Sequence, residues 1–110
     1  MADMFWEKYW AVVGFSRSFA EKLMDGIEAA SGKEVEQCIR GRNQMITLFK
    51  DGTTLRWLKA SDNCKGFRIG VMWCDKNINK AVFKDVISPM YFGKYEDIIW
   101  VEEKDYGDSN

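Results

Sequence analysis

Hydrophobic residues along this chain form short runs whose spacing alternates between the periods of strands and helices. The first run, YWAVVGFS at 9–16, is unbroken and rich in aromatic and β-branched residues. A second run of this kind, RIGVMWCD, occupies 68–75. Continuous apolar runs of this length are typical of strands that are covered on both faces. Both runs are therefore predicted to be central strands, with the second beside the first.

A helix is predicted between 16 and 32, in SRSFAEKLMDGIEAASG, because its apolar positions recur every fourth residue. These positions are Phe19, Leu23 and Ile27. Ser18 stands three residues before Glu21, which is a capping-box spacing, so the helix is expected to begin there. Gly32 is expected to end it.

Three further segments complete the predicted order. EVEQCIRG at 34–41 and EDIIWVEE at 96–103 are short strands, and NINKAVFKDVISPM at 77–90 has helical spacing, with Pro89 marking its end. The chain then reads β-α-β-β-β-β-α-β, which predicts one small α+β or α/β domain over 1–104 with a mixed sheet and two helices. The acidic residues at 105–110 are expected to form a flexible tail.

The segment NQMITLFKDGTTLRWLKA at 43–60 reads as a hairpin, because Asp51-Gly52 separates two strand-like runs. A two-residue turn places Lys50 opposite Thr53, and this register sets which residues share a face. The expected apolar core face consists of Ile46, Leu48, Leu55 and Trp57. Arg56 and Lys59 are then expected to point outward.

Charge is segregated along the chain although its net value is only −1. Residues 40–68 carry seven Lys or Arg against two Asp, and residues 96–108 carry six acids against one base. The basic candidates for binding are Arg40, Arg42, Arg56, Lys59, Lys65 and Arg68, which are interleaved with Trp57 and Phe67. Cations beside aromatic rings could contact phosphates and bases. The alternative is a solvated charged face, and the pI near 5.5 argues against general affinity for nucleic acid.

The residue types exclude much enzyme chemistry. The chain has no histidine, which removes Ser-His and Cys-His pairs and the common zinc sites. Its three cysteines form no C-x-x-C pair; Cys64 beside Lys65 is the best candidate for a reactive thiol, and inert cysteine is the alternative. No cofactor or metal is predicted. With no signal-peptide core and no apolar membrane span, a cytoplasmic protein is expected.

The stretch from WAVVGFS to ISPM resembles part of a known protein family. A strand and helix, the hairpin ITLFKDGTTLRWLKASD, the segment KGFR and an apolar strand ending in Asp75 are similar to the middle of a phage terminase large-subunit ATPase. The resemblance implies a magnesium-holding role for Asp75, followed by a catalytic glutamate. Here Lys76 takes that place, and the G-x-x-x-x-G-K-[ST] phosphate loop is absent. The resemblance therefore implies a phage framework without ATPase activity.

These observations favour a small non-catalytic protein of a phage or mobile element that binds a partner protein, with inhibition of a host system as one form. Its expected aromatic anchors are Trp6, Phe92 and Tyr95, and Trp10 could equally be core. The alternative is a nucleic-acid-binding module that uses residues 40–68. An enzyme that uses Asp75 with a metal ranks third.

Overall fold

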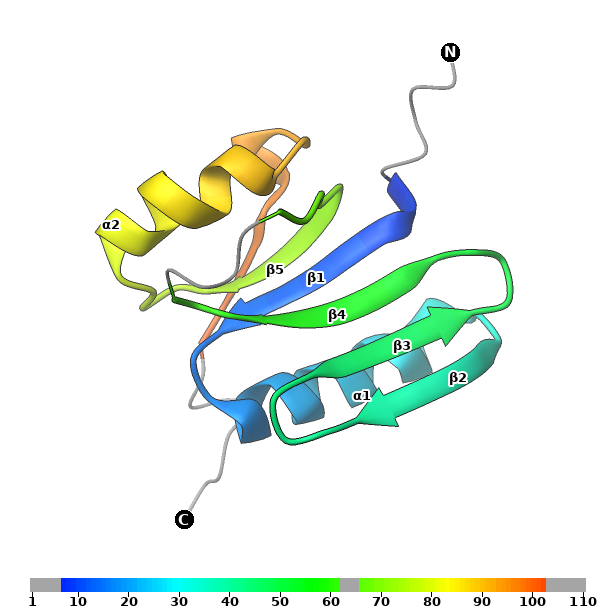
Figure 1. Ribbon diagram of the computed structural model, residues 1–110. Coiled ribbons are helices and arrows are strands. Elements are labelled where there is room, and N and C mark those ends of the chain that lie inside the picture. The colour runs from blue at the N-terminus through cyan, green and yellow to red at the C-terminus, as the bar shows by residue number, and fades with distance from the viewer. Residues whose placement is uncertain (1–6, 62–65, 103–110) are drawn as a thin grey trace.

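The fold is a six-stranded mixed sheet with helical segments on both faces (Figure 1), seen in a computed structural model that describes residues 7–61 and 66–102. The strands follow the order β2-β3-β4-β1-β5-β6, and all run parallel except β3. The elements are β1 (Tyr9–Gly14), α1 (Arg17–Ser31), β2 (Val35–Arg40), β3 (Met45–Phe49), β4 (Thr54–Lys59), β5 (Val71–Asp75), α2 (Lys80–Val82) and β6 (Ile99–Val101). This single α/β domain confirms the predicted order of strands and helices.

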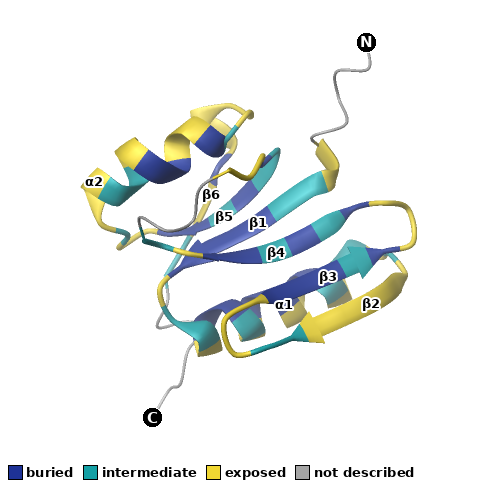
Figure 2. Ribbon diagram, in the orientation of Figure 1, coloured by how far each residue is buried: buried dark blue, intermediate teal, exposed yellow. Residues whose placement is uncertain are grey.

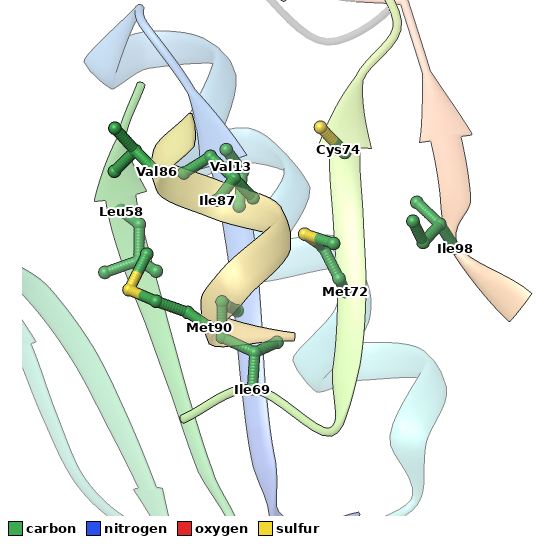
Figure 3. Packing of buried hydrophobic residues seen from close by; sticks show 10 residues of the cluster. Val13, Leu58, Ile69, Met72, Cys74, Val86, Ile87, Met90 and Ile98 are labelled. Carbon is green, nitrogen blue, oxygen red and sulfur yellow. The ribbon is translucent and has the colours of Figure 1, made fainter. Parts of the chain in front are cut away.

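Strand β1 lies at the centre of the sheet, paired in parallel with β4 and β5, as the apolar runs predicted. Its successive side chains enter two different cores. Val12 packs under α1 with residues of β3 and β4, whereas Val13 packs on the opposite face with residues of β5 and the segment after α2. Figure 3 shows this second core, where the helical segment that carries Val86, Ile87 and Met90 lies over the sheet between Leu58 of β4 and Met72 of β5.

The two helical layers cover different halves of the sheet. Helix α1 packs on β1, β3 and β4, while the segment that begins with α2 packs on β1, β4 and β5. No residue of β2 or β3 belongs to the second core. Figure 2 shows the result, since the edge strand β2 is exposed along nearly its whole length. The outer face of β2 and β3 therefore has no helix over it.

Helix α1 starts two residues earlier than the capping-box spacing predicted. Ser16 is the N-cap, because it has an extended backbone and its hydroxyl accepts a hydrogen bond from the N–H of Phe19. Ser18 lies inside the first turn. The chain turns directly after Gly14, where the Phe19 ring leaves no room for a Cβ atom. Gly32 ends the helix with φ of 73°, as predicted.

The predicted register of the β3–β4 hairpin is wrong by one residue. Thr47 lies opposite Leu55 and Ile46 opposite Arg56, because the loop has three residues, 50–52, and not two. The N–H of Gly52 donates to the Phe49 carbonyl (3.0 Å), and Gly52 has φ of +94°. A turn followed by a left-handed glycine is the usual three-residue hairpin.

The slipped register changes the composition of both faces. Met45 and Phe49, rather than Ile46 and Leu48, join Leu55 and Trp57 beneath α1. Ile46 and Leu48 therefore share the other face of the hairpin with Arg56.

The second helical segment is irregular. After α2, capped by Asn79, the chain continues through a wider turn, η2 (Phe83–Ile87), and a tight turn, η3 (Ser88–Met90). Pro89 lies within η3, so the helical segment ends one residue later than predicted, at Met90.

None of the helices in the described ranges is long and apolar enough to cross a membrane. The predicted tail at 105–110 lies outside the described residues.

Candidate binding site around Arg56

The basic candidates do not gather on one surface. Arg40 lies on the α1 face, where its guanidinium contacts Glu28 (2.6 Å) and Asp25 (3.2 Å) of α1 and the hydroxyl of Thr47. Burial alone lowers the pKa of Arg40, but the hydrogen bonds to Glu28 and Asp25 outweigh it and the pKa is raised. Arg40 is thus part of an internal ion-pair network.

Arg56 lies on the opposite face of the sheet, at the middle of β4. Its guanidinium carbon stands 4.7 Å from the centre of the Phe67 ring, which stacks on it from the β4–β5 connection. Burial lowers the pKa of Arg56, although a guanidinium stays charged in proteins. Within residues 7–61 and 66–102 no carboxylate pairs with Arg56. The side chain is therefore a half-buried cation that has an aromatic contact and no acidic partner in the described part of the chain.

A shallow pocket of about 420 Å³ opens beside Arg56. It is lined by Ile46, Trp57 and Leu58 and by the polar residues Asn43, Gln44 and Ser61. A guanidinium and two amides beside apolar residues can bind an anionic planar group such as a carboxylate through several hydrogen bonds.

Lys59 adds a second cation to this surface. It also lines the pocket, and its ammonium stands 5.0 Å from the centre of the Phe15 ring, which is 64% exposed. A second, smaller pocket of about 270 Å³ is lined by Arg68 together with Arg56 and Phe67. We call the residues Phe15, Arg56, Lys59 and Phe67 the Arg56 surface.

The remaining candidates have other positions. Arg42 is exposed in the turn between β2 and β3. Trp6 and Lys65 lie outside the described residues. Phe92 is exposed beside the start of β5, where its N–H donates to the carbonyl of Ile69 (2.8 Å).

The other aromatic suspects belong to two separate groups of rings. Tyr95 lies against the rings of Phe83 and Trp100, with centres 6.3 and 6.0 Å away. Trp10 packs between Phe49 and Trp73 at the edge of the core beneath α1. Trp10 also lines the smaller pocket that contains Arg56 and Phe67, whereas Tyr95 lines a different pocket with Phe83 and Trp100.

Two of the residues considered for catalysis, Cys74 and Asp75, are buried at the end of β5. Burial, reinforced by the charge of Asp75, raises the pKa of the Cys74 thiol to about 12, so the thiolate is disfavoured. Asp75 is buried at the end of β5 and accepts a hydrogen bond from the N–H of Asn77 (3.0 Å). Cys64 lies outside the described residues.

Sequence reasoning named Arg56 and Lys59 but missed their neighbours. Phe15 was assigned to the first strand and Asn43 and Gln44 to the hairpin, and only the fold brings them near Arg56. The one available signal was the phenylalanine, Phe15, directly after an apolar strand.

Compared with known proteins, the chain matches no family model, no curated protein and no solved structure.

Proposed function

We propose that this protein is a non-catalytic binding protein that captures a partner protein by accepting an acidic side chain of that partner against Arg56. The observation that carries the proposal is the half-buried Arg56 guanidinium, which contacts the Phe67 ring, lines an open pocket and has no paired carboxylate among the described residues. Burying a charge without an opposite charge is unfavourable. A partner carboxylate would offset that penalty and form hydrogen bonds strengthened by both charges.

The distribution of the other cations supports a protein partner over a nucleic acid. Nucleic-acid binding by charge requires several cations that follow the phosphate backbone. In the hairpin region Arg40 is held by Glu28 on the opposite face, and Lys33 and Lys50 are paired with Asp51 and Glu34. Arg56 and Lys59 line one pocket together with apolar residues, and Arg68 lines the neighbouring pocket. A single carboxylate fits this surface better than an extended strand of phosphates.

The alternative, a single-stranded nucleic acid, rests on the exposed rings of Phe15 and Phe67, which could stack on bases beside the two cations. The dependence of affinity on salt concentration distinguishes a protein partner from a single-stranded nucleic acid. Affinity that rests on phosphate contacts falls steeply in a log–log plot against salt, with a slope that grows with each contact. One carboxylate contact in a protein interface gives a shallow dependence.

The proposal is tested by capture from a bacterial lysate, followed by purification of the retained protein and titration. Arg56→Glu with Lys59→Glu should weaken capture at least tenfold, or about 1.4 kcal/mol. Lys84→Glu with Lys94→Glu is the matched control, because it makes the same charge change at exposed residues that do not line the pocket. A host lysate is the first choice because the terminase-like segment predicts a phage origin.

Two results would overturn the proposal. The first is full capture by the folded Arg56/Lys59 variant. The second is equal loss in both double variants, which would assign the effect to net charge alone. Retention of single-stranded DNA in place of a protein, with a steep salt slope, would favour the alternative function.

A further inference from the structure

Strand β6 forms one edge of the sheet, and its outward main-chain groups have no partner strand within the described ranges 7–61 and 66–102. The N–H of Lys76, just after β5, donates to the carbonyl of Val101 (2.8 Å), so the backbone groups of Val101 point toward β5. Backbone groups of successive strand residues point to opposite sides. The N–H and C=O of Trp100 therefore point to the outer edge, where no described strand lies.

Two pockets flank this edge, one on each face of the sheet. On the α1 face an apolar groove of about 440 Å³ lies between α1 and β6, lined by Leu23, Ile27, Trp73, Ile99 and Val101 among others. On the other face a pocket of about 330 Å³ is formed by Phe83, Tyr95 and Trp100, with Lys76 and Lys80 also lining it. The edge thus has an apolar pocket on one side and an aromatic pocket with lysines on the other.

We propose that β6 accepts an extended segment of a partner protein as a seventh strand, in which apolar residues alternate with acidic residues. Strand addition provides hydrogen bonds to the backbone of Trp100, and the alternating side chains of the added strand enter the pockets on the two faces. Apolar residues would cover the groove beside Ile99 and Val101. Acidic residues would lie over Trp100 and reach Lys80.

On the aromatic side, Lys80 is the cation that an acidic residue of the added strand would contact. Lys76 already binds Glu102 (2.8 Å), but no described acid pairs with Lys80, which is exposed at the start of α2. A second copy of this chain fits less well. Pairing two β6 strands about a two-fold axis would bring both copies of Lys80 to the same face, where their charges repel.

Labelled peptides of eight residues test the proposal by fluorescence anisotropy. A peptide of alternating valine and glutamate should bind at least tenfold more tightly than one of alternating valine and lysine. Lys80→Glu should weaken the glutamate peptide at least tenfold. The control is Lys84→Glu, an exposed lysine outside this pocket, which should leave binding unchanged.

A pair of variants at one position tests the role of the backbone. Trp100→Pro removes the outward N–H and keeps the bonds of Val101 to β5, and proline is tolerated at such edge positions. Trp100→Ala removes the same indole ring and keeps the N–H. Binding of the glutamate peptide should be at least fivefold weaker in Trp100→Pro than in Trp100→Ala. If the proline variant fails to fold, as judged by circular dichroism, the Lys80 comparison decides alone.

Equal affinity for the two peptides, no binding of either, or equal effects of Lys80→Glu and Lys84→Glu would overturn the proposal. Dimers in sedimentation experiments that the glutamate peptide fails to dissociate would assign the edge to a second copy. The outcome is independent of the Arg56 surface. Arg56→Glu with Lys59→Glu should bind the glutamate peptide like the unmodified protein, so either proposal can fail alone.

Discussion

Arg40 and Arg56 come from the same basic segment, yet the fold gives them opposite environments. Arg40, on β2, is held by Glu28 and by Thr47 beneath α1. Arg56, on β4, has an aromatic ring and an open pocket on the other face. A helix that carries acids covers one arginine, and no helix covers the other. The charge of a segment alone therefore does not identify a binding surface. What matters is whether the fold brings an acidic side chain to each cation.

The first prediction removes the acid that makes Arg40 different. Glu28→Ala should lower the free energy of unfolding by about 2–3 kcal/mol, because Arg40 and the buried Thr47 hydroxyl both lose the carboxylate they share. The side chains of Arg40 and Glu28 are only 16% and 18% exposed, so solvent screens the pair weakly. Urea unfolding measures the change.

Asp25→Ala is the matched control. Asp25 contacts the same guanidinium but is 63% exposed, so its loss should change the unfolding free energy by at most about 0.5 kcal/mol. Equal effects of the two substitutions would mean that the Glu28 network contributes no more than a surface ion pair.

The second prediction concerns the turn that places Arg56 on the open face. Gly52→Val should lower the unfolding free energy by about 1–2 kcal/mol, because a β-branched residue is strained at φ of +94°. Gly52→Asn should lower it less, since asparagine tolerates this conformation. Thermal unfolding of both variants measures the difference. Equal melting temperatures for the valine variant and the unmodified protein would show that the turn adjusts without strain.

The sequence predicted the architecture because period and composition are local signals. The two apolar runs became neighbouring central strands, and Phe19, Leu23 and Ile27 became the buried face of α1. Such patterns need only the residues of one element. The two-residue turn at Asp51-Gly52 was also a local signal, but it competes with a three-residue turn that uses the same glycine. The hydrogen bond from Thr53 N–H to the Asp51 carboxylate accompanies the longer loop.

The candidate site was predicted only in part, for a different physical reason. Sequence pattern placed Arg56 and Lys59 outward, and the structure places both beside the pocket. Arg40 looked equivalent, because its partners Glu28 and Asp25 lie 12 and 15 residues away on a helix of another layer. The stacking of Phe67 on Arg56 likewise depends on the path of the β4–β5 connection. Contacts of this kind have no period and are visible only in the fold.

The last prediction has the smallest expected effect and separates the two arginines most directly. Arg56→Met should leave the unfolding free energy within about 0.5 kcal/mol of its original value. Methionine retains the apolar stem against Phe67 and removes a charge that burial disfavours. The lost contact between the cation and the ring, about 0.5–1 kcal/mol, is offset by the relief of that desolvation. Urea unfolding measures stability, and the capture assay measures function.

Stability and binding should therefore separate at Arg56 and not at Arg40. Arg56→Met should lose partner capture while the protein remains as stable as before, because a thioether cannot bind a carboxylate. Arg40→Met should do the reverse, since it leaves Glu28 facing Thr47 without its cation while the Arg56 pocket stays intact. A loss of more than about 1 kcal/mol in Arg56→Met would indicate that Arg56 has an acidic partner within this chain. Arg56 would then be a structural ion pair like Arg40, and the binding surface would have to be sought at the edge of β6.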